Sequence, residues 1–287
     1  VFEAVVDQIR KAPGVKLIDY FPDADFNRTV IECLGEPKPL KAALLAMAGK
    51  SYDLIDMEKQ QGKHPRIGAQ DTIPLFPLRN ISLEECAALA EEIGAEVWER
   101  YKVPVYFSGE NARTPERKEL SFIRKGQYEG LKEVAHLPER APDLGPAKLH
   151  PTAGATIVSA AKANLVAVNM ILNTQDLEIA KSIAKMVRGP SGGFSTIRAV
   201  AFKPDGYDYA AVSMNMFDTA NTPIYRVFQL VDNEAKRFGL TIVGTQICGT
   251  LHQSDLIDSA AYFLRVVDFK ENQILEKSIL ALDEEAE

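Results

Sequence analysis

The chain has few of the residues that cross-link small proteins or hold metal ions. Its 287 residues include only three cysteines, Cys33, Cys86 and Cys248, and four histidines. The cysteines are far apart and form no CxxC pair, which argues against a disulfide framework and a zinc knuckle. No HExxH motif or other cluster of histidine and cysteine occurs, so we expect no metal site. Each cysteine lies in an apolar run, as a small buried side chain does in a reducing compartment.

Basic residues are also fewer than acidic residues. The chain has 33 Lys and Arg against 40 Asp and Glu, a formal net charge of −7, which argues against binding to nucleic acid or to an anionic membrane surface. No apolar run reaches the roughly 18 residues of a membrane span, and the first residues show no signal-peptide pattern. We therefore expect a cytoplasmic protein that binds small molecules, with any anionic ligand held by locally gathered basic side chains.

Two common enzyme signatures find no support either. G-x-G-x-x-G does not occur, and the G-x-S-x-G match, Gly189-Pro190-Ser191-Gly192-Gly193, follows a helix instead of a strand, so neither the simplest dinucleotide-binding signal nor the simplest hydrolase signal is present. What the chain does have is an ordinary globular composition, with 46% hydrophobic and 25% charged residues. Its length predicts one or two domains with a large core.

The second half has a clear periodic order. Apolar residues at helical spacing from Leu177 stop at Gly189, and a second such stripe follows Pro223 and stops at Gly239. The apolar runs around these helices predict strands at 165–172, 197–202, 209–217 and 240–247, with a closing helix from about 254. The resulting order is β-α-β-β-α-β, the ferredoxin-like pattern.

The first half repeats this order without its first strand. We expect strands at 15–20, 29–34 and 103–107, a proline-broken apolar segment at 73–78, and helices that end near 11, open at 39 and open behind a capping box at Ser82-x-x-Glu85. Since Val1 already lies in an amphipathic helix, we expect that a strand upstream of it is missing. The predicted class is α/β (α+β), with two similar ferredoxin-like subdomains, each a mixed sheet with helices on one face.

Residues 126–162 join the two halves and differ from them in character. Glycine and proline are frequent there, and no long periodic run occurs. A connection of this length is unusual unless it has a function, and ligands often bind between domains. We therefore expect a first subdomain at 1–162, a second at 163–287, and a binding cleft between them.

The segment Gly62–Asp71 gathers reactive side chains, because His64, Arg66 and Asp71 lie within eight residues. Pro65 favours an extended backbone at His64, and an imidazole with a pKa of about 6.5 can accept and donate a proton at neutral pH. Arg66 is suited to pair with a carboxylate through two hydrogen bonds. Composition alone favours a solvated loop with a structural histidine, and a catalytic loop is the alternative.

Stretches in both halves carry a family resemblance. They are Asn27-Arg28-Thr29-Val30, Leu54-Ile55-Asp56-Met57, Gly62–Asp71, Val103-Pro104-Val105-Tyr106, residues 123–131, His150-Pro151-Thr152-Ala153-Gly154-Ala155-Thr156, Leu172-Asn173-Thr174, Val212-Ser213-Met214-Asn215 and Val243-Gly244-Thr245-Gln246. In this order they resemble the formiminotransferase domain found in glutamate formiminotransferases and in the bifunctional formiminotransferase-cyclodeaminase. The resemblance covers the transferase alone. It implies two α/β subdomains with a folate cleft between them, and a homodimer. It also implies transfer of the formimino group of N-formimino-L-glutamate to N5 of tetrahydrofolate, the co-substrate, in histidine degradation and one-carbon metabolism.

The resemblance also implies roles for single residues. The histidine of the family's Gly-x-His-Pro-Arg motif is His64, a general acid and base that takes a proton from the attacking N5 and returns one to the leaving nitrogen. The family's folate-binding stretch corresponds to Gly145, Pro146, Ala147, Lys148, Leu149, His150, Pro151, Thr152, Ala153 and Gly154. Glycines in this stretch let the backbone approach the flat pterin ring. The substrate-binding candidates are Arg66, Asp71, Arg124 and Lys125, with a solvated helix end as the alternative for Arg124 and Lys125.

The chain departs from the family pattern in several places. Phe21 stands where animal members have an acid, Lys63 where glutamate is usual, and Gly249-Thr250-Leu251-His252 where Gly-Leu-Val-Pro is usual. The opening Pro-Asn-Phe-Ser-Glu-Gly segment of the family is missing. Other functions therefore stay open: formyl transfer linked to 5-formyltetrahydrofolate, a folate-binding paralogue without turnover, or an orphan α/β protein whose cleft takes a different ligand.

Overall fold

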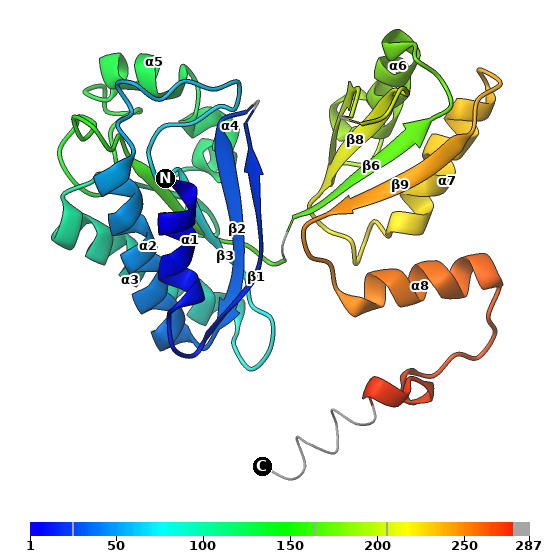
Figure 1. The fold of residues 1–287 in the computed structure, drawn as a ribbon, viewed down its shortest axis with the longest axis horizontal. Coiled ribbons are helices and arrows are strands. Elements are labelled where there is room, and N and C mark those ends of the chain that lie inside the picture. The colour runs from blue at the N-terminus through cyan, green and yellow to red at the C-terminus, as the bar shows by residue number, and fades with distance from the viewer. Residues whose placement is uncertain (25, 164, 205, 278–287) are drawn as a thin grey trace. The chain divides into compact units, whose positions relative to one another are not determined.

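The computed structural model describes residues 1–24, 26–163, 165–204 and 206–277 (Figure 1). The chain divides into two compact units, Val1–Asn164 and Leu165–Glu287. Each unit combines helices with sheets, which confirms the predicted α/β class with two units. Within the described residues, no helix is both long enough and apolar enough to cross a membrane.

The second unit has the predicted order of elements. These are β6 (Val166–Leu172), α6 (Leu177–Val187), β7 (Ile197–Phe202), β8 (Ala211–Met216), α7 (Ile224–Lys236), β9 (Ile242–Cys248) and α8 (Gln253–Leu264). The strands pair in the order β7-β8-β6-β9, which is the ferredoxin-like arrangement. The predicted mixed sheet is wrong for this unit, because every neighbouring pair is antiparallel. β6 and β7, which α6 joins, run in the same direction, but they are not neighbours. β8 lies between them and runs in the opposite direction.

The two helices between these strands form for the reasons that the sequence indicates. The Asp176 side chain caps α6 by accepting hydrogen bonds from the backbone N–H groups of Glu178 and Ile179. The buried residues of α6 are Ala180, Ile183, Ala184 and Val187, and those of α7 are Ile224, Val227, Val231 and Ala235. Both sets recur at helical spacing and pack in one cluster with the inward side chains of the sheet.

The first unit contains two separate sheets. Its elements before residue 110 are α1 (Phe2–Arg10), β1 (Val15–Asp23), β2 (Arg28–Gly35), α2 (Pro37–Leu54), β3 (Thr72–Leu75), α3 (Leu83–Tyr101) and β4 (Val105–Gly109). β1 and β2 form an antiparallel pair, whereas β3 and β4 both pair in parallel with β5 (Thr156–Ala160). In the second unit β6 joins β8 to β9, but among the residues described in the first unit no strand joins β2 to β3. The two units are therefore less alike than their sequences suggest.

Residues 126–162 are more ordered than the sequence indicates. After η1 (Pro115–Lys118) and α4 (Leu120–Ile123), the chain forms α5 (Gln127–Val134) and then β5, the central strand of the parallel sheet. The interpretation of this region as a connection without regular structure is therefore wrong. The sequence did not predict β5, because four of its five residues are buried and it shows no alternation of polar and apolar residues.

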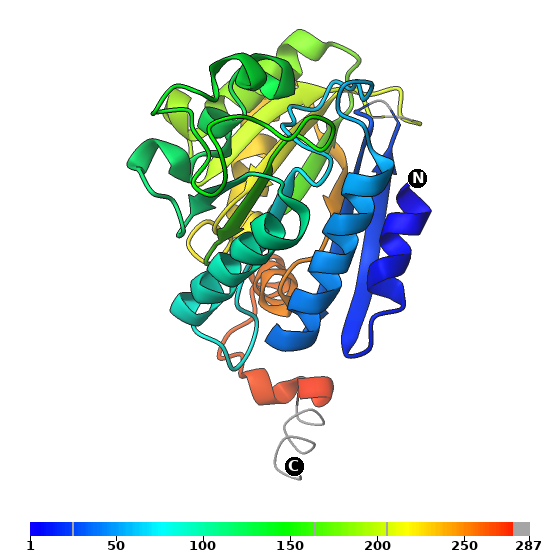
Figure 2. The same ribbon diagram turned by 90° about the vertical axis from the view of Figure 1, so that its left-hand side faces the viewer.

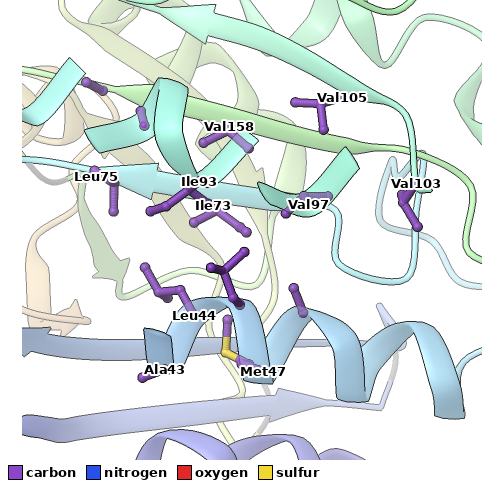
Figure 3. Packing of buried hydrophobic residues seen from close by; sticks show 14 of the residues in the cluster. Ala43, Leu44, Met47, Ile73, Leu75, Ile93, Val97, Val103, Val105 and Val158 are labelled. Atoms are coloured by element: carbon purple, nitrogen blue, oxygen red, sulfur yellow. The ribbon is translucent and has the colours of Figure 1, made fainter. Parts of the chain in front are cut away.

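Two cores of the first unit lie on different sides of its parallel sheet. The larger packs α1, α2 and α3, which run side by side, against the inward residues of β3, β4 and β5 (Figures 2 and 3). The smaller contains Met57, Ile67, Tyr106, Ile123, Tyr128, Leu131, Ala135, Leu149, Ala155 and Ile157. This smaller core anchors residues from the 55–71 loop and from the 145–154 segment, the stretches that the resemblance associates with function.

Candidate active site

His64 lies on the long loop between α2 and β3, and its side chain is partly buried. One polar neighbour is Arg28, whose Nη1 is 3.3 Å from His64 Nε2. The Phe26 ring meets the imidazole edge-on, with 6.2 Å between the ring centroids. Phe26 lies in the connection between β1 and β2, and Arg28 is the first residue of β2, so the end of this hairpin forms one wall around the histidine.

Hydrogen bonds from side-chain amides to backbone carbonyls hold the connection between β1 and β2 against the His64 loop. Gln60 Nε2 donates to the Asn27 carbonyl at 2.9 Å, and the Asn27 side-chain amide donates to the Gln61 carbonyl. A Cβ atom on Gly62 would lie 2.4 Å from the Phe26 carbonyl oxygen, closer than any side chain permits. Gly62 therefore allows the loop to approach the connection closely enough for Arg28 to reach His64.

The surroundings of His64 favour a neutral imidazole. Burial lowers the pKa of His64 below its ordinary value, and the positive charges of Arg28 and Arg124 lower it further. Asp71 and a hydrogen bond to the Pro65 backbone act in the opposite direction without outweighing them. A neutral ring at neutral pH is a proton acceptor, which is the form that a general base needs.

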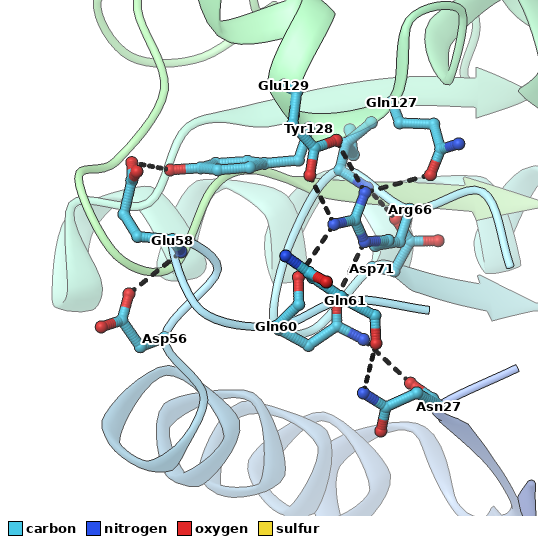
Figure 4. A network of polar contacts seen from close by, with 11 residues as sticks. Asn27, Asp56, Glu58, Gln60, Gln61, Arg66, Asp71, Gln127, Tyr128 and Glu129 are labelled. Carbon is cyan, nitrogen blue, oxygen red and sulfur yellow. Dashed lines mark hydrogen bonds and ion pairs between the residues drawn. The ribbon is translucent and has the colours of Figure 1, made fainter. Parts of the chain in front are cut away.

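Arg66 forms the expected pair of hydrogen bonds with a carboxylate, but that carboxylate is Glu129 of the protein itself. Its guanidinium donates to both carboxylate oxygens of Glu129, at 2.8 and 2.6 Å, and to the Gln127 side chain at 3.0 Å. It also donates to the side chain and the backbone carbonyl of Gln60 (Figure 4). These contacts use all five N–H donors of a guanidinium, and Arg66 is only 8% exposed. Arg66 therefore has no free N–H group for the predicted contact with a substrate carboxylate.

Asp71 and Arg124 form an ion pair near His64. Asp71 Oδ1 accepts from the Ile67 backbone N–H at 2.7 Å, and its other oxygen accepts from Arg124 Nη2. Arg124 lies directly after α4, and its buried Nε has no hydrogen-bond partner. Lys125 is different, because its side chain is exposed, while its backbone carbonyl accepts from Arg140 at 3.1 Å and its N–H donates to the Phe122 carbonyl at 3.3 Å.

The 145–154 segment lies against the His64 loop, although the two are far apart in sequence. Ala69 donates its backbone N–H to the Ala153 carbonyl at 2.9 Å, and Met57 donates to the Thr152 carbonyl at 2.7 Å. Gly68 and Gly154 form an isolated antiparallel bridge between the two segments. A Cβ atom on Gly68 would lie 2.0 Å from the Ala155 carbonyl oxygen, so the close approach requires glycine.

Within the 145–154 segment, exposed and buried residues alternate in short blocks. Gly145, Pro146, Ala147, Lys148, Pro151 and Thr152 are exposed, whereas Leu149, Ala153 and Gly154 are buried. The two glycines serve protein packing, because a Cβ atom on Gly145 would lie 3.0 Å from the Trp98 ring and one on Gly154 would lie 2.2 Å from the Ile67 carbonyl oxygen. Packing within the protein is therefore a sufficient reason for glycine at both positions, and the approach of this backbone to a pterin ring stays a prediction.

His150 stabilises its own turn. Its Nδ1 accepts hydrogen bonds from the backbone N–H groups of Thr152 and Ala153, at 3.3 and 3.0 Å. The His150 backbone also exchanges hydrogen bonds with Gly154, at 2.8 and 3.2 Å. The neutral ring therefore carries its proton on Nε2, and the side chain shapes the turn between the exposed Pro151 and the buried Gly154.

The sequence indicated His64, Asp71 and Arg124 as site residues, but not the contacts of His64 with Arg28 and Phe26. The available signal was the stretch 27–30, which carries part of the family resemblance and begins at Asn27, a residue with a left-handed backbone (φ of 48°). Among the residues that the structure describes, no group of three or more metal ligands is found.

The second unit has a hollow of about 350 Å³ over β7 and β8, lined by Arg188, Arg198, Ala199, Val200, Ser213 and Asn215.

Comparisons with known proteins cover both units. Residues 1–161 match the N-terminal subdomain of the formiminotransferase domain, and residues 165–283 match the formiminotransferase domain. The chain is 36% identical over 281 residues to a glutamate formimidoyltransferase of Streptococcus pyogenes serotype M1, covering 98% of this chain and 94% of that protein. It is 37% identical over 275 residues to a glutamate formimidoyltransferase of Thermoplasma acidophilum, covering 95% of this chain and 90% of that protein.

A longer relative matches over part of its length. The formimidoyltransferase-cyclodeaminase of Gallus gallus is 36% identical over 270 residues, which cover 92% of this chain and 50% of that protein. Matches to both parts of one domain, in order and over nearly the whole sequence, show the family. The chain belongs to the formiminotransferase domain family.

Proposed function

We propose that the chain transfers the formimino group of N-formimino-L-glutamate to N5 of tetrahydrofolate, giving 5-formiminotetrahydrofolate and glutamate. The relatives named glutamate formimidoyltransferase support the reaction, since the chain covers nearly all of their length. The observation that carries the role of His64 is its setting: a partly buried imidazole with a lowered pKa beside Arg28 and the Asp71–Arg124 pair.

In the proposed mechanism His64 moves one proton twice. N5 of tetrahydrofolate attacks the formimino carbon, and neutral His64 accepts the N5 proton as the new C–N bond forms. The tetrahedral intermediate then breaks its bond to the glutamate nitrogen, which takes the proton back from His64. A lowered pKa suits both steps, because the ring starts unprotonated and the imidazolium readily returns its proton.

Both substrates would bind next to His64 and contact the residues around it. We assign folate to the 145–154 segment, whose exposed residues remain accessible to a ligand: Gly145, Pro146, Ala147, Lys148, Pro151 and Thr152. Arg124, Lys125 and Lys148 supply positive charge for the carboxylates of the two substrates. Arg66 and Asp71 act in support, since Arg66 pairs with Glu129 and Asp71 holds both the Ile67 backbone and Arg124.

Further expectations about compartment, assembly, partners and the two units belong to this proposal. The working enzyme is a cytoplasmic homodimer, its ligands are the two small molecules, and neither nucleic acid nor a membrane takes part. The two units act as the N-terminal and C-terminal formiminotransferase subdomains, as their separate family matches support. Tetrahydrofolate is a co-substrate that leaves with the formimino group.

A donor assay tests the reaction. The protein is mixed with tetrahydrofolate and N-formimino-L-glutamate, and the absorbance of the methenyl product is followed after acid treatment. Product formation supports the proposal. Product from 5-formyl donors alone would favour formyl transfer, folate binding without product would favour a binding protein, and failure to retain any reduced folate would favour an unrelated ligand.

A further inference from the structure

The contact between Arg28 and His64 determines which ring nitrogen carries the lone pair. A guanidinium has only donors, so a hydrogen bond from Arg28 Nη1 to His64 Nε2, at 3.3 Å, requires an unprotonated Nε2. In the neutral imidazole the proton then lies on Nδ1. The nitrogen that could serve as the base is therefore the one that Arg28 covers.

Arg28 is held in this place by its own strand and turn. It is the first residue of β2 and stands opposite Asp23 of β1 in the antiparallel register. Its guanidinium carbon lies 5.9 Å from the centre of the Phe26 ring, the same ring that meets His64 edge-on. Because Asn27 is tied to Gln60 and Gln61, the arginine and the histidine keep their relative position.

The charged groups around His64 come from four elements of the first unit. Arg28 (β2) and Arg124 (after α4) lower the pKa of His64, and Asp71 (before β3) raises it. Burial lowers the pKa of Arg28, and the charge of Arg124 also lowers it, whereas Asp23 (β1) acts in the opposite direction and favours the charged guanidinium. Asp71 is already bound to Arg124, so it does not neutralise Arg28.

The guanidinium of Arg28 retains the capacity to bind an anion. Arg28 is exposed, and within the described part of the chain its Nε and Nη2 have no hydrogen-bond acceptor. Its contact with His64 is long for a hydrogen bond, whereas an arginine binds a carboxylate at about 2.7–2.9 Å and often through two parallel bonds. A carboxylate arriving here would therefore outcompete the imidazole.

Resting on the proposed function, we propose that Arg28 is both the positioning residue of His64 and the binding residue for a carboxylate of the formimino donor. Before the donor binds, Arg28 holds the Nε2 lone pair. When a donor carboxylate pairs with the guanidinium, Nε2 is released to accept the N5 proton, which it later returns to the leaving glutamate nitrogen. The base is thus uncovered only when the donor is in place.

Nuclear magnetic resonance of the histidine rings tests this without turnover. In the full chain with isotope-labelled histidine, the His64 signal is assigned with His64→Asn, and its pKa and tautomer are followed by titration. We expect neutral His64 to carry its proton on Nδ1. Arg28→Gln should raise the His64 pKa and weaken this tautomer preference, whereas Arg28→Lys should keep the pKa low. Added N-formimino-L-glutamate should raise the His64 pKa in the parent protein only.

Steady-state kinetics give a second readout. Loss of a charged hydrogen bond should raise KM for N-formimino-L-glutamate about ten- to a hundredfold in Arg28→Gln. KM for formamidine, a formimino donor without a carboxylate, should not change. Arg100→Gln is the matched control, since Arg100 is an exposed arginine of α3 paired with Glu96. An unaltered His64 titration in Arg28→Gln, or equal KM effects on both donors, overturns the assignment of Arg28. An inactive parent protein with the expected titration would instead count against the proposed function alone.

Discussion

At the scale of single residues, the imidazole of His64 is controlled by burial and by two arginines that other segments supply. Arg28 touches Nε2 and Arg124 acts through its charge, while Asp71 is occupied by Arg124 and the Ile67 backbone. Neither arginine could be assigned to the histidine from spacing alone, because they lie 36 residues before it and 60 residues after it. The motif around His64 was readable, but its electrostatic setting depends on the fold.

The lowered pKa of His64 has a consequence for the pH dependence of the reaction. Because the neutral ring is the base, kcat/KM should fall as the pH drops through the pKa of His64 in the free enzyme. Burial and the two arginines place that pKa below the ordinary value of 6.5, so activity should persist to lower pH than an unperturbed histidine allows. A pH profile of kcat/KM with an acidic midpoint above 6.5 would contradict this.

Arg66 provides a second prediction at this scale. Its guanidinium is engaged by Glu129, Gln127 and Gln60, so Arg66→Met should destabilise the protein by about 1–3 kcal/mol. The variant should change KM for N-formimino-L-glutamate little when assayed at a temperature where it is folded. Urea unfolding and initial rates measure the two effects. A large rise in KM without loss of stability would instead support the direct contact between Arg66 and the substrate that the sequence suggested.

At the scale of elements, the site depends on the bridge between the His64 loop and the 145–154 segment. The loop has little regular structure, and it is fixed by backbone hydrogen bonds and by Ile67, which is fully buried in the smaller core. The sequence marked both segments separately. Their contact was not predictable, because it arises from the parallel pairing of β3 with β5, and β5 itself carries no strand-like alternation.

This bridge makes two glycines sensitive to substitution. A Cβ atom on Gly68 or Gly154 would lie 2.0 or 2.2 Å from a backbone oxygen, and Gly154 also has a φ of +74°. Gly154→Ala should therefore destabilise the protein by at least about 1–3 kcal/mol and reduce activity, because the loops must separate.

Gly130→Ala is the matched control for this prediction. Gly130 lies inside α5, and a Cβ atom there meets nothing within 4 Å. Alanine favours a helix interior over glycine, so this change should stabilise the protein by up to about 1 kcal/mol. Urea unfolding of both variants gives the comparison. Equal stability of the two alanine variants would show that the bridge is not tightly packed.

At the scale of the whole molecule, the two units differ in how well their sequences predicted them. In the second unit α6 and α7 each have a single buried stripe and the strands lie next to clear turns, so the periodicity predicted the element order and the ferredoxin-like topology. In the first unit the parallel sheet joins strands from distant parts of the chain, so the elements before residue 110 were predictable but α5, β5 and the pairing of the sheet were not. The family match spans both units, and the histidine, its arginines and the 145–154 segment all belong to the first.

The turnover of His64→Ala in the full chain tests the central claim most directly. With tetrahydrofolate and N-formimino-L-glutamate as substrates, we predict a loss of about 10²–10⁴ in kcat, with binding of the reduced folate largely retained. His136→Ala, which changes an exposed histidine outside the site, should turn over at the parent rate. A His64→Ala protein that forms the methenyl product as fast as the parent protein would contradict the account.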